Sequence, residues 1–213
     1  MITVKEKFGA TLILDDMLVL PNFWDVTVNM EPNPVFADEL SSYNIAVDRI
    51  QVFIESMLDN SIFISPDHIK YFMDGLPLSG VAHTTPDLPY DHILTMCLYT
   101  KFSNIVEGRC IVQNVKLESY QANGVQHSHG LEDGDPETLR NLFAEEDPAF
   151  AEYWYDSTVK FFNLSTNGMK LNVTGWEKFD LAFDKKPGDV VQLDTFRKKF
   201  KPKDDDDGTD NIA

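Results

Sequence analysis

Cysteine, basic residues and long apolar runs are all scarce in this chain of 213 residues. Its two cysteines, Cys97 and Cys110, are too few for the disulfide framework of a small secreted protein. Both lie in apolar, periodic stretches, so we predict buried free thiols. No apolar run approaches the ~20 residues of a membrane-spanning helix, and Met1–Lys7 lacks the apolar segment of a secretory signal. We therefore expect a cytoplasmic protein that does not bind membranes.

Basic residues are outnumbered: 18 Lys and Arg face 35 Asp and Glu, which gives a formal net charge of -17. Binding to the nucleic-acid backbone relies on Lys and Arg to displace counterions, so general nucleic-acid binding is not expected. Hydrophobic residues make up 43% of the chain, which is enough to build a core. We predict one domain over residues 1–196 and a disordered charged tail over 197–213.

The pattern of apolar residues predicts an α+β fold. Trp24–Met30 alternates with period two, as in a half-buried strand, after a hairpin turn expected at Asp15-Asp16. Helical spacing follows at about 36–60, and again at 93–106, and a strand is expected at 109–120 with a bulge between Val112 and Val115. Residues 121–134 are expected to form a loop. Two acidic helices, at about 136–145 and 148–162, precede C-terminal strands at 169–173 and 190–193. Regular β-α-β alternation is missing, which disfavours a doubly wound parallel sheet.

The negative charge is unevenly distributed along the chain. Residues 1–131 carry -9 and residues 157–213 are neutral, whereas Glu132–Asp156 carries -8 with Arg140 as its single base. Acids such as Asp135 and Glu137 at a helix start also fit the ordinary compensation of the helix dipole.

The functional alternative is an acidic surface that docks a basic protein partner. The predicted partner-binding residues are two groups, acids and aromatic anchors: Glu145, Glu146, Glu152, Tyr153 and Trp154. This gives a non-enzymatic interaction or assembly protein without a cofactor. A narrower alternative is an acidic mimic of nucleic acid that inhibits a DNA-binding protein.

Histidines provide the rival hypothesis, a metal-dependent enzyme. His127 and His129 are two residues apart, so on a strand both would point to the same side and could bind one metal ion. The residues around this pair do not match the ligand spacing of two known kinds of metal site. A metallo-β-lactamase-type site needs Asp and His where this chain has Leu131 and Glu132. A cupin-type site also needs a wider gap between the second histidine and its glutamate.

Other catalytic patterns are incomplete. His83-Thr84-Thr85 matches one half of the paired motif of two-histidine phosphoesterases, but neither His92 nor His127 supplies the other half. The sequence has no phosphate-binding Gly-Lys-Ser/Thr loop, no Gly-x-Ser-x-Gly elbow and no Cys-x-x-Cys pair.

Two short segments, Ile45–Ile50 and Asn104–Arg109, resemble parts of the small uncharacterised proteins encoded by large tailed bacteriophages. The resemblance implies an accessory or structural viral role, in the host cytoplasm or the virion. It assigns no role to any individual residue.

Overall fold

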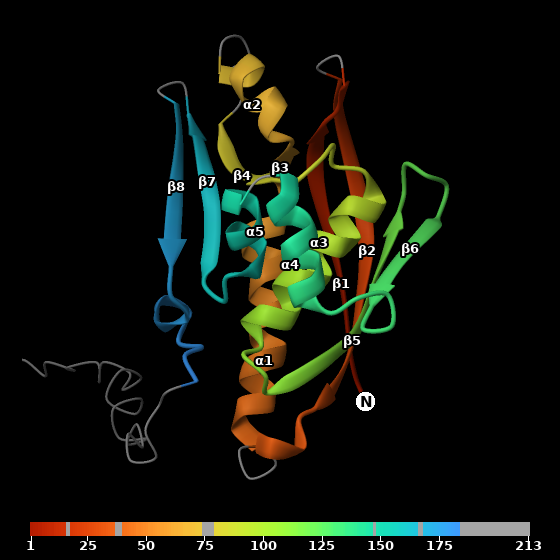
Figure 1. The fold of residues 1–213 in the computed structure, drawn as a ribbon, viewed down its shortest axis with the longest axis vertical. Helices are drawn as coiled ribbons and strands as arrows, with labels where there is room; N and C mark the ends of the chain where they lie inside the picture. Colours follow the sequence, from red (N-terminus) through yellow and green to blue (C-terminus); the bar gives the residue numbers. More distant parts are fainter. Residues whose placement is uncertain (16–17, 37–39, 74–78, 147, 166–167, 184–213) are drawn as a thin grey trace, which may run out of the picture. The chain divides into compact units, whose positions relative to one another are not determined.

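The computed structural model describes residues 1–15, 18–36, 40–73, 79–146, 148–165 and 168–183. Within them, eight strands form one mixed sheet in the order β6-β5-β2-β1-β3-β4-β7-β8 (Figure 1). The strands are β1 (Ile2–Ile13), β2 (Val19–Pro32), β3 (Ser61–Ile64), β4 (Gly80–Thr84), β5 (Cys110–Ser119), β6 (Val125–Gly130), β7 (Val159–Ser165) and β8 (Gly168–Thr174). The combination of helices with this sheet is an α+β fold.

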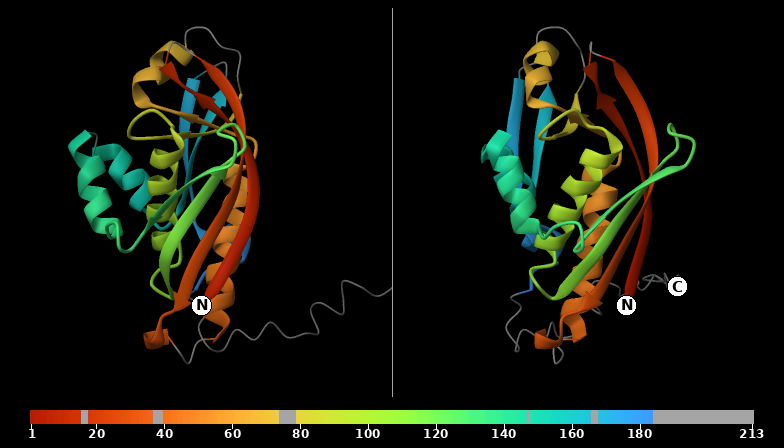
Figure 2. Two further views of the ribbon diagram at one scale, coloured as in Figure 1. Left: turned by 90° about the vertical axis from the view of Figure 1, so that its right-hand side faces the viewer. Right: turned by 45° about the vertical axis from the view of Figure 1, so that its right-hand side comes forward.

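The helices are α1 (Leu40–Phe53), α2 (Pro66–Met73), α3 (Asp91–Ile105), α4 (Pro136–Glu146) and α5 (Pro148–Tyr155). A π-helical turn, η3 (Ile54–Leu58), continues α1, and short 3-10 turns occur at η2 (Pro34–Phe36) and η4 (Trp176–Phe179). Figure 2 shows α3 against the sheet and α4 and α5 on the far side of α3. The helices α4 and α5 therefore form an outer layer.

The N-terminal strands form a long antiparallel hairpin. The pairing of β1 with β2 runs from Ile2 opposite Met30 to Ile13 opposite Val19. The predicted two-residue turn at Asp15-Asp16 is wrong, because the strands end at Ile13 and restart at Val19. One face of the hairpin is buried, in agreement with its period-two pattern, and includes Phe8 stacked on Trp24 at a centroid distance of 5.0 Å.

The predicted bulge in β5 is confirmed. Asn29 lies opposite Asn114, whereas Met30 lies opposite Val112, so Gln113 is the extra residue. The loop expected over 121–134 is wrong in part, because β6 pairs along the outer edge of β5. His127 and His129 therefore lie in an edge strand.

The middle of the sheet is parallel, which the sequence pattern did not predict. Strand β3 pairs with β1, and β4 pairs with β3, both in the parallel sense. Such pairs need crossover connections, which α1 and α2 provide. The result is a mixed sheet with antiparallel pairs toward both edges.

Arg49, on α1, forms hydrogen bonds that hold the segment around Leu181 against this helix. Its Nε donates to the carbonyl of Leu181 at 2.8 Å, and its Nη1 donates to the carbonyl of Ile105 at 2.9 Å and to Oε1 of Glu107 at 2.7 Å. The guanidinium also lies 4.9 Å from the ring centroid of Trp176. A single buried cation thereby joins three segments that are far apart in the sequence.

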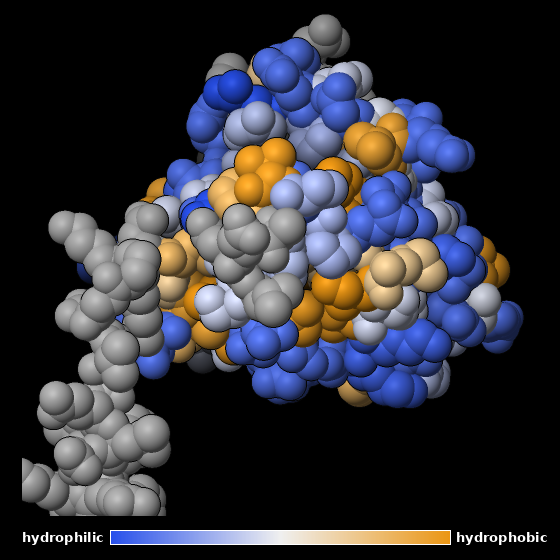
Figure 3. All heavy atoms as spheres, turned by 90° about the horizontal axis from the view of Figure 1, so that it is seen from below, coloured by the Kyte–Doolittle hydropathy of each residue, from blue (hydrophilic) through white to orange (hydrophobic). Residues whose placement is uncertain are grey.

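The chain divides after Ala182 into one compact unit, Met1–Ala182, and a second unit that begins at Phe183. The expected domain end at residue 196, the tail 197–213 and the strand at 190–193 lie outside the described residues. Both cysteines are buried and free, as predicted. Among the described helices, none has the length and apolar character needed to cross a membrane. The surface in Figure 3 is largely hydrophilic, with hydrophobic patches interrupted by polar residues.

Candidate functional site

The acidic segment, Glu132–Asp156, begins in the turn after β6 and includes the helices α4 and α5. Asp135 caps α4, because its Oδ1 accepts a hydrogen bond of 2.7 Å from the backbone N–H of Thr138. This hydrogen bond lowers the pKa of the Asp135 carboxyl. The side chain is nevertheless exposed, so one carboxylate both stabilises the helix start and adds charge to the surface.

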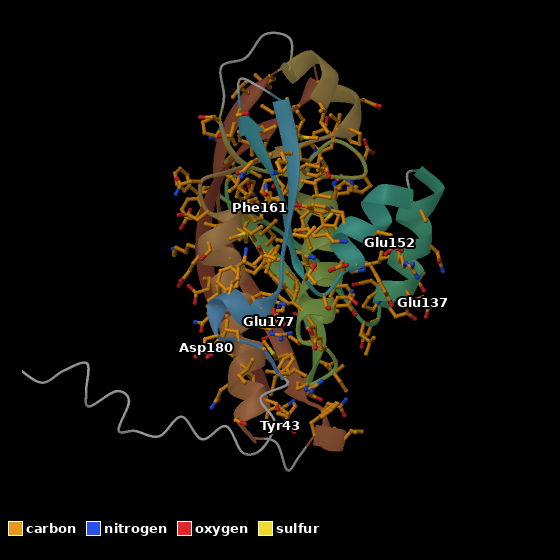
Figure 4. All side chains as sticks on the ribbon, turned by 90° about the vertical axis from the view of Figure 1, so that its left-hand side faces the viewer. Tyr43, Glu137, Glu152, Phe161, Glu177 and Asp180 are labelled. Atoms are coloured by element: carbon orange, nitrogen blue, oxygen red, sulfur yellow. The ribbon has the colours of Figure 1, made fainter. Side chains whose placement is uncertain are left out.

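Five exposed carboxylates in this segment define what we call the acidic surface: Glu132, Asp133, Asp135, Glu137 and Glu152. Glu137 and Glu152 lie on the outer layer formed by α4 and α5 (Figure 4). Arg140 forms an ion pair with Glu152, and its guanidinium lies 4.8 Å from the ring centroid of Tyr155. The single base of the segment is therefore already engaged.

The other predicted partner-binding residues are placed differently. Glu145 and Glu146 belong to the last turn of α4, but their side chains lie outside the described residues. Tyr153 and Trp154 are buried, with 4% and 0% of their surface exposed. Their prediction as aromatic anchors at the surface was wrong, because α5 turns both rings inward against the rest of the fold. The Trp154 Nε1 donates to the carbonyl of Thr84 at 2.7 Å.

A buried polar network surrounds Tyr153. The Nδ1 of His83 lies 2.6 Å from the Tyr153 hydroxyl, and its Nε2 lies 2.7 Å from the carbonyl of Met57. Because a carbonyl can only accept, Nε2 carries the proton, and in the neutral ring Nδ1 accepts from the hydroxyl. The same hydroxyl lies 3.0 Å from the carbonyl of Lys160. Burial lowers the pKa of His83 to about 4, which keeps the ring neutral.

Lys101 is a second buried cation, which the sequence analysis missed. Its Nζ donates to the carbonyls of Tyr153, Asp156 and Thr158 at 3.2, 2.7 and 3.0 Å. Burial lowers the pKa of Lys101 to about 7, even though three acceptors surround the ammonium group. A signal was available, because Lys101 lies four residues after Cys97 on the apolar stripe of α3.

These buried groups have a structural role. His83 is fully buried and Lys101 has 0% of its surface exposed. Burial also raises the pKa values of the Tyr153 hydroxyl and the Cys97 thiol well above their ordinary values, so neither ionises near neutral pH. A general base or nucleophile must reach a substrate, and these side chains are enclosed by the core. The network instead holds α5 against β4 and β7.

A cavity of about 270 Å³ lies on the sheet, lined by Asp25, Glu118, Ser119, Tyr120, Asn123 and Gly124. One of its two carboxylates is already paired, since Lys7 forms an ion pair with Asp25 at 3.0 Å and donates to the Tyr120 hydroxyl at 3.0 Å. This arrangement explains the raised pKa of Lys7, for which the bond to Tyr120 is the largest cause. We assign the cavity no catalytic role.

The two candidate metal ligands have different neighbours. His127 lies with its ring centroid 6.1 Å from that of His92 at the start of α3. The centroid of the His129 ring lies 5.1 Å from that of Tyr99, which comes seven residues after His92 on α3. Burial lowers the pKa of His129. No cluster of three or more His, Cys, Asp or Glu side chains suited to a metal occurs among the described residues.

Comparisons with protein families and with curated proteins assign no function to this chain. No protein-family model matches the chain, and a search of curated proteins returns no match.

Proposed function

We propose that this chain is a non-enzymatic interaction or assembly protein that docks a basic protein partner through the acidic surface. The observation that carries the proposal is the grouping of five exposed carboxylates on and beside a helix pair whose inner side is firmly anchored. Trp154 is fully buried in that anchor, and Leu139 is nearly so. A rigid charged face loses little entropy when it binds, which favours complex formation.

Electrostatics define the partner. The segment Glu132–Asp156 carries a net charge of -8, and its one base, Arg140, is paired with Glu152. Complementary charge mainly accelerates association and selects the partner, whereas affinity needs desolvated contacts as well. With Tyr153 and Trp154 inside, the half-buried Tyr155 and the exposed Leu131 are the apolar side chains that the described part of this region offers.

The resemblance of two short segments to phage proteins suggests an accessory or structural role in a virus for this docking. The alternative of nucleic-acid mimicry is a special case of the same surface, in which the basic partner is a DNA-binding protein. A duplex DNA competitor distinguishes the two, since it would displace a mimic from the nucleic-acid groove of its partner.

The test is affinity capture from extract of the native host, with the full chain as bait. A variant that combines Glu132→Lys and Glu137→Lys should lose most of the captured basic partner, because it replaces attraction by repulsion at two of the five carboxylates of the surface. The matched control is Glu31→Lys with Asp67→Lys, which makes the same change in net charge at exposed positions on other elements.

Ionic strength provides a second readout. Because the Debye length falls from about 30 Å at 0.01 M salt to about 10 Å at 0.1 M, capture by the natural chain should weaken over this range. Equal capture by the two charge-reversed variants would refute the acidic surface as the docking site. Capture that does not respond to salt would argue for an apolar interface elsewhere.

A further inference from the structure

We infer that His92 and His127 form a binding site for a single divalent transition-metal ion, of the kind that Zn²⁺ and Ni²⁺ represent. The site differs from the pair that the sequence suggested, since it joins one histidine of β6 to a histidine of α3. It does not depend on the proposed docking function.

The geometry of the two rings carries the inference. Their centroids are 6.1 Å apart and their planes are inclined by 49°. Two imidazoles that share a tetrahedral zinc ion through bonds of about 2.0–2.1 Å have ring centroids roughly 5 Å apart. Since the His92 side chain is exposed and that of His127 is half-buried, side-chain rotation alone can bring the rings together by about 1 Å.

The backbones that carry the two rings are fixed. His127 lies opposite Leu117 in the ladder between β6 and β5. His92 follows Asp91, whose Oδ1 accepts a hydrogen bond of 2.7 Å from Nε1 of Trp24, so the first turn of α3 is tied to β2. Tyr90 stacks on one face of His92 with an interplanar angle of 11°. Because the backbones are fixed, only the two side chains need to be ordered when the ion binds, which lowers the entropic cost of binding.

His129 is excluded from the pair by its surroundings. Its ring packs edge-on against Tyr99 on α3, with the ring centroids 5.1 Å apart. With two protein ligands, the remaining coordination positions would be filled by water. Imidazole nitrogen suits borderline ions such as zinc and nickel, whereas the many carboxylates of this chain prefer calcium and magnesium. This difference allows the site to be separated from non-specific cation binding.

The experiment is calorimetric titration of the full chain, without a histidine tag, with Zn²⁺ and separately with Ni²⁺ in millimolar Mg²⁺. The expected result is one equivalent bound. The variants His92→Ala and His127→Ala should each weaken binding at least about tenfold, because even the loss of an outer-shell partner costs 10–100-fold. The double variant should bind the ion only a little more weakly than either single variant, because each single substitution already removes a ligand of the same ion.

The control is His129→Ala, on the same strand and the same side of it, which should leave the affinity unchanged. Unchanged binding in His92→Ala would overturn the inference, as would a loss in His129→Ala that matches the loss in His127→Ala. Folding of each variant is checked in chelator by its thermal transition.

Hydrogen exchange adds a readout that a loosely bound surface ion would not produce. An ion shared by α3 and β6 should slow amide exchange in the edge strand β6 of the natural chain, and the slowing should disappear in His92→Ala. Zinc-dependent protection that persists in this variant would also overturn the shared site.

Discussion

At the scale of single residues, the buried hydroxyl of Tyr153 has the most demanding position. Its oxygen lies 2.6 Å from the buried Nδ1 of His83, to which it donates its hydrogen, and 3.0 Å from the carbonyl oxygen of Lys160. Buried acceptors that lose their donor retain the full cost of desolvation. The Tyr153 hydroxyl therefore contributes to the attachment of α5, together with the hydrogen bond from Trp154 to Thr84.

Replacing Tyr153 by Phe should lower the free energy of unfolding by about 1–3 kcal/mol, because the buried Nδ1 of His83 loses its donor while the ring remains. Urea denaturation at pH 7 measures this change. The control is Tyr90→Phe, which removes a hydroxyl from an exposed side chain and should change stability by less than about 0.5 kcal/mol. Equal effects of the two substitutions would contradict the network.

His83 makes stability depend on pH. Its pKa falls from 6.5 to about 4 on burial, so between these values the unfolded chain binds a proton that the folded chain does not. The free energy of unfolding should therefore decrease as the pH falls from 6.5 to 4, by on the order of 3 kcal/mol from this residue.

Because carboxylates also titrate in this range, the measurement is the difference between the natural chain and His83→Gln. Denaturation at pH 7.0, 5.5 and 4.5 should show a smaller loss of stability for the variant, which has no titrating group at this position. Parallel curves for the two proteins would show that His83 is not the source of the dependence.

At the scale of elements, the edge strand β6 relies on the bulge in β5. The backbone N–H of Leu131 donates to the carbonyl of Gln113, the extra residue of the bulge, at 2.9 Å. A Cβ added at Gly130 would collide with that same carbonyl and would lie 2.8 Å from the Cβ of Asn114. A side chain at position 130 is therefore incompatible with this ladder.

Gly130→Ala should destabilise the protein by about 1–3 kcal/mol, since the clash involves backbone that cannot move freely. Denaturation with urea measures the loss. Ser128→Ala is the matched control, as an exposed position in the same strand, and should be nearly neutral. If the two variants are equally stable, β6 does not approach β5 as closely as described.

The elements differ in how far the sequence predicts them. The helix α3 follows from the apolar stripe that includes Leu94, Leu98 and Phe102, because burial of one face imposes a helical period. Strand β6, with the sequence Val-Gln-His-Ser-His-Gly, has no apolar alternation, because an edge strand is held mainly by backbone hydrogen bonds. The parallel pairing of β1, β3 and β4 is non-local, so no local pattern encodes it.

The candidate site was predicted in its charge and not in its packing. The charge of the segment 132–156 can be read from the sequence, but period alone could not decide which way Tyr153 and Trp154 face. An aromatic pair next to charged residues is compatible with a surface anchor and with a helix that covers a core. Similarly, His127 was identified, but its neighbour His92 comes from an element 35 positions earlier in the chain.

At the scale of the whole molecule, the dominant property is the net charge of -17. Five salt bridges are described, and two of them, Lys7–Asp25 and Arg140–Glu152, join side chains that are both exposed and so contribute little to stability. Repulsion between like charges, which destabilises a compact state, should then outweigh the attraction of these pairs.

Added salt should consequently stabilise the protein. The thermal midpoint at pH 7 should rise when NaCl increases from 10 mM to 500 mM, because screening weakens repulsion more than it weakens the few ion pairs. Differential scanning calorimetry provides the measurement, and potassium chloride should give the same rise if screening is the cause. A midpoint that falls with salt would indicate that attractive pairs dominate.

The attachment of Arg49 has a consequence for the order in which the chain is made. Its acceptor Leu181 lies 132 residues later in the sequence, so α1 and the early strands leave the ribosome long before that carbonyl exists. A nascent chain that has been extended only to α3 contains neither the carbonyl of Leu181 nor the ring of Trp176, the two groups from the C-terminal part that contact this guanidinium. A chain that stops before Leu181 would therefore lack one of the three carbonyl and carboxylate acceptors that surround the buried guanidinium of Arg49 in the folded unit.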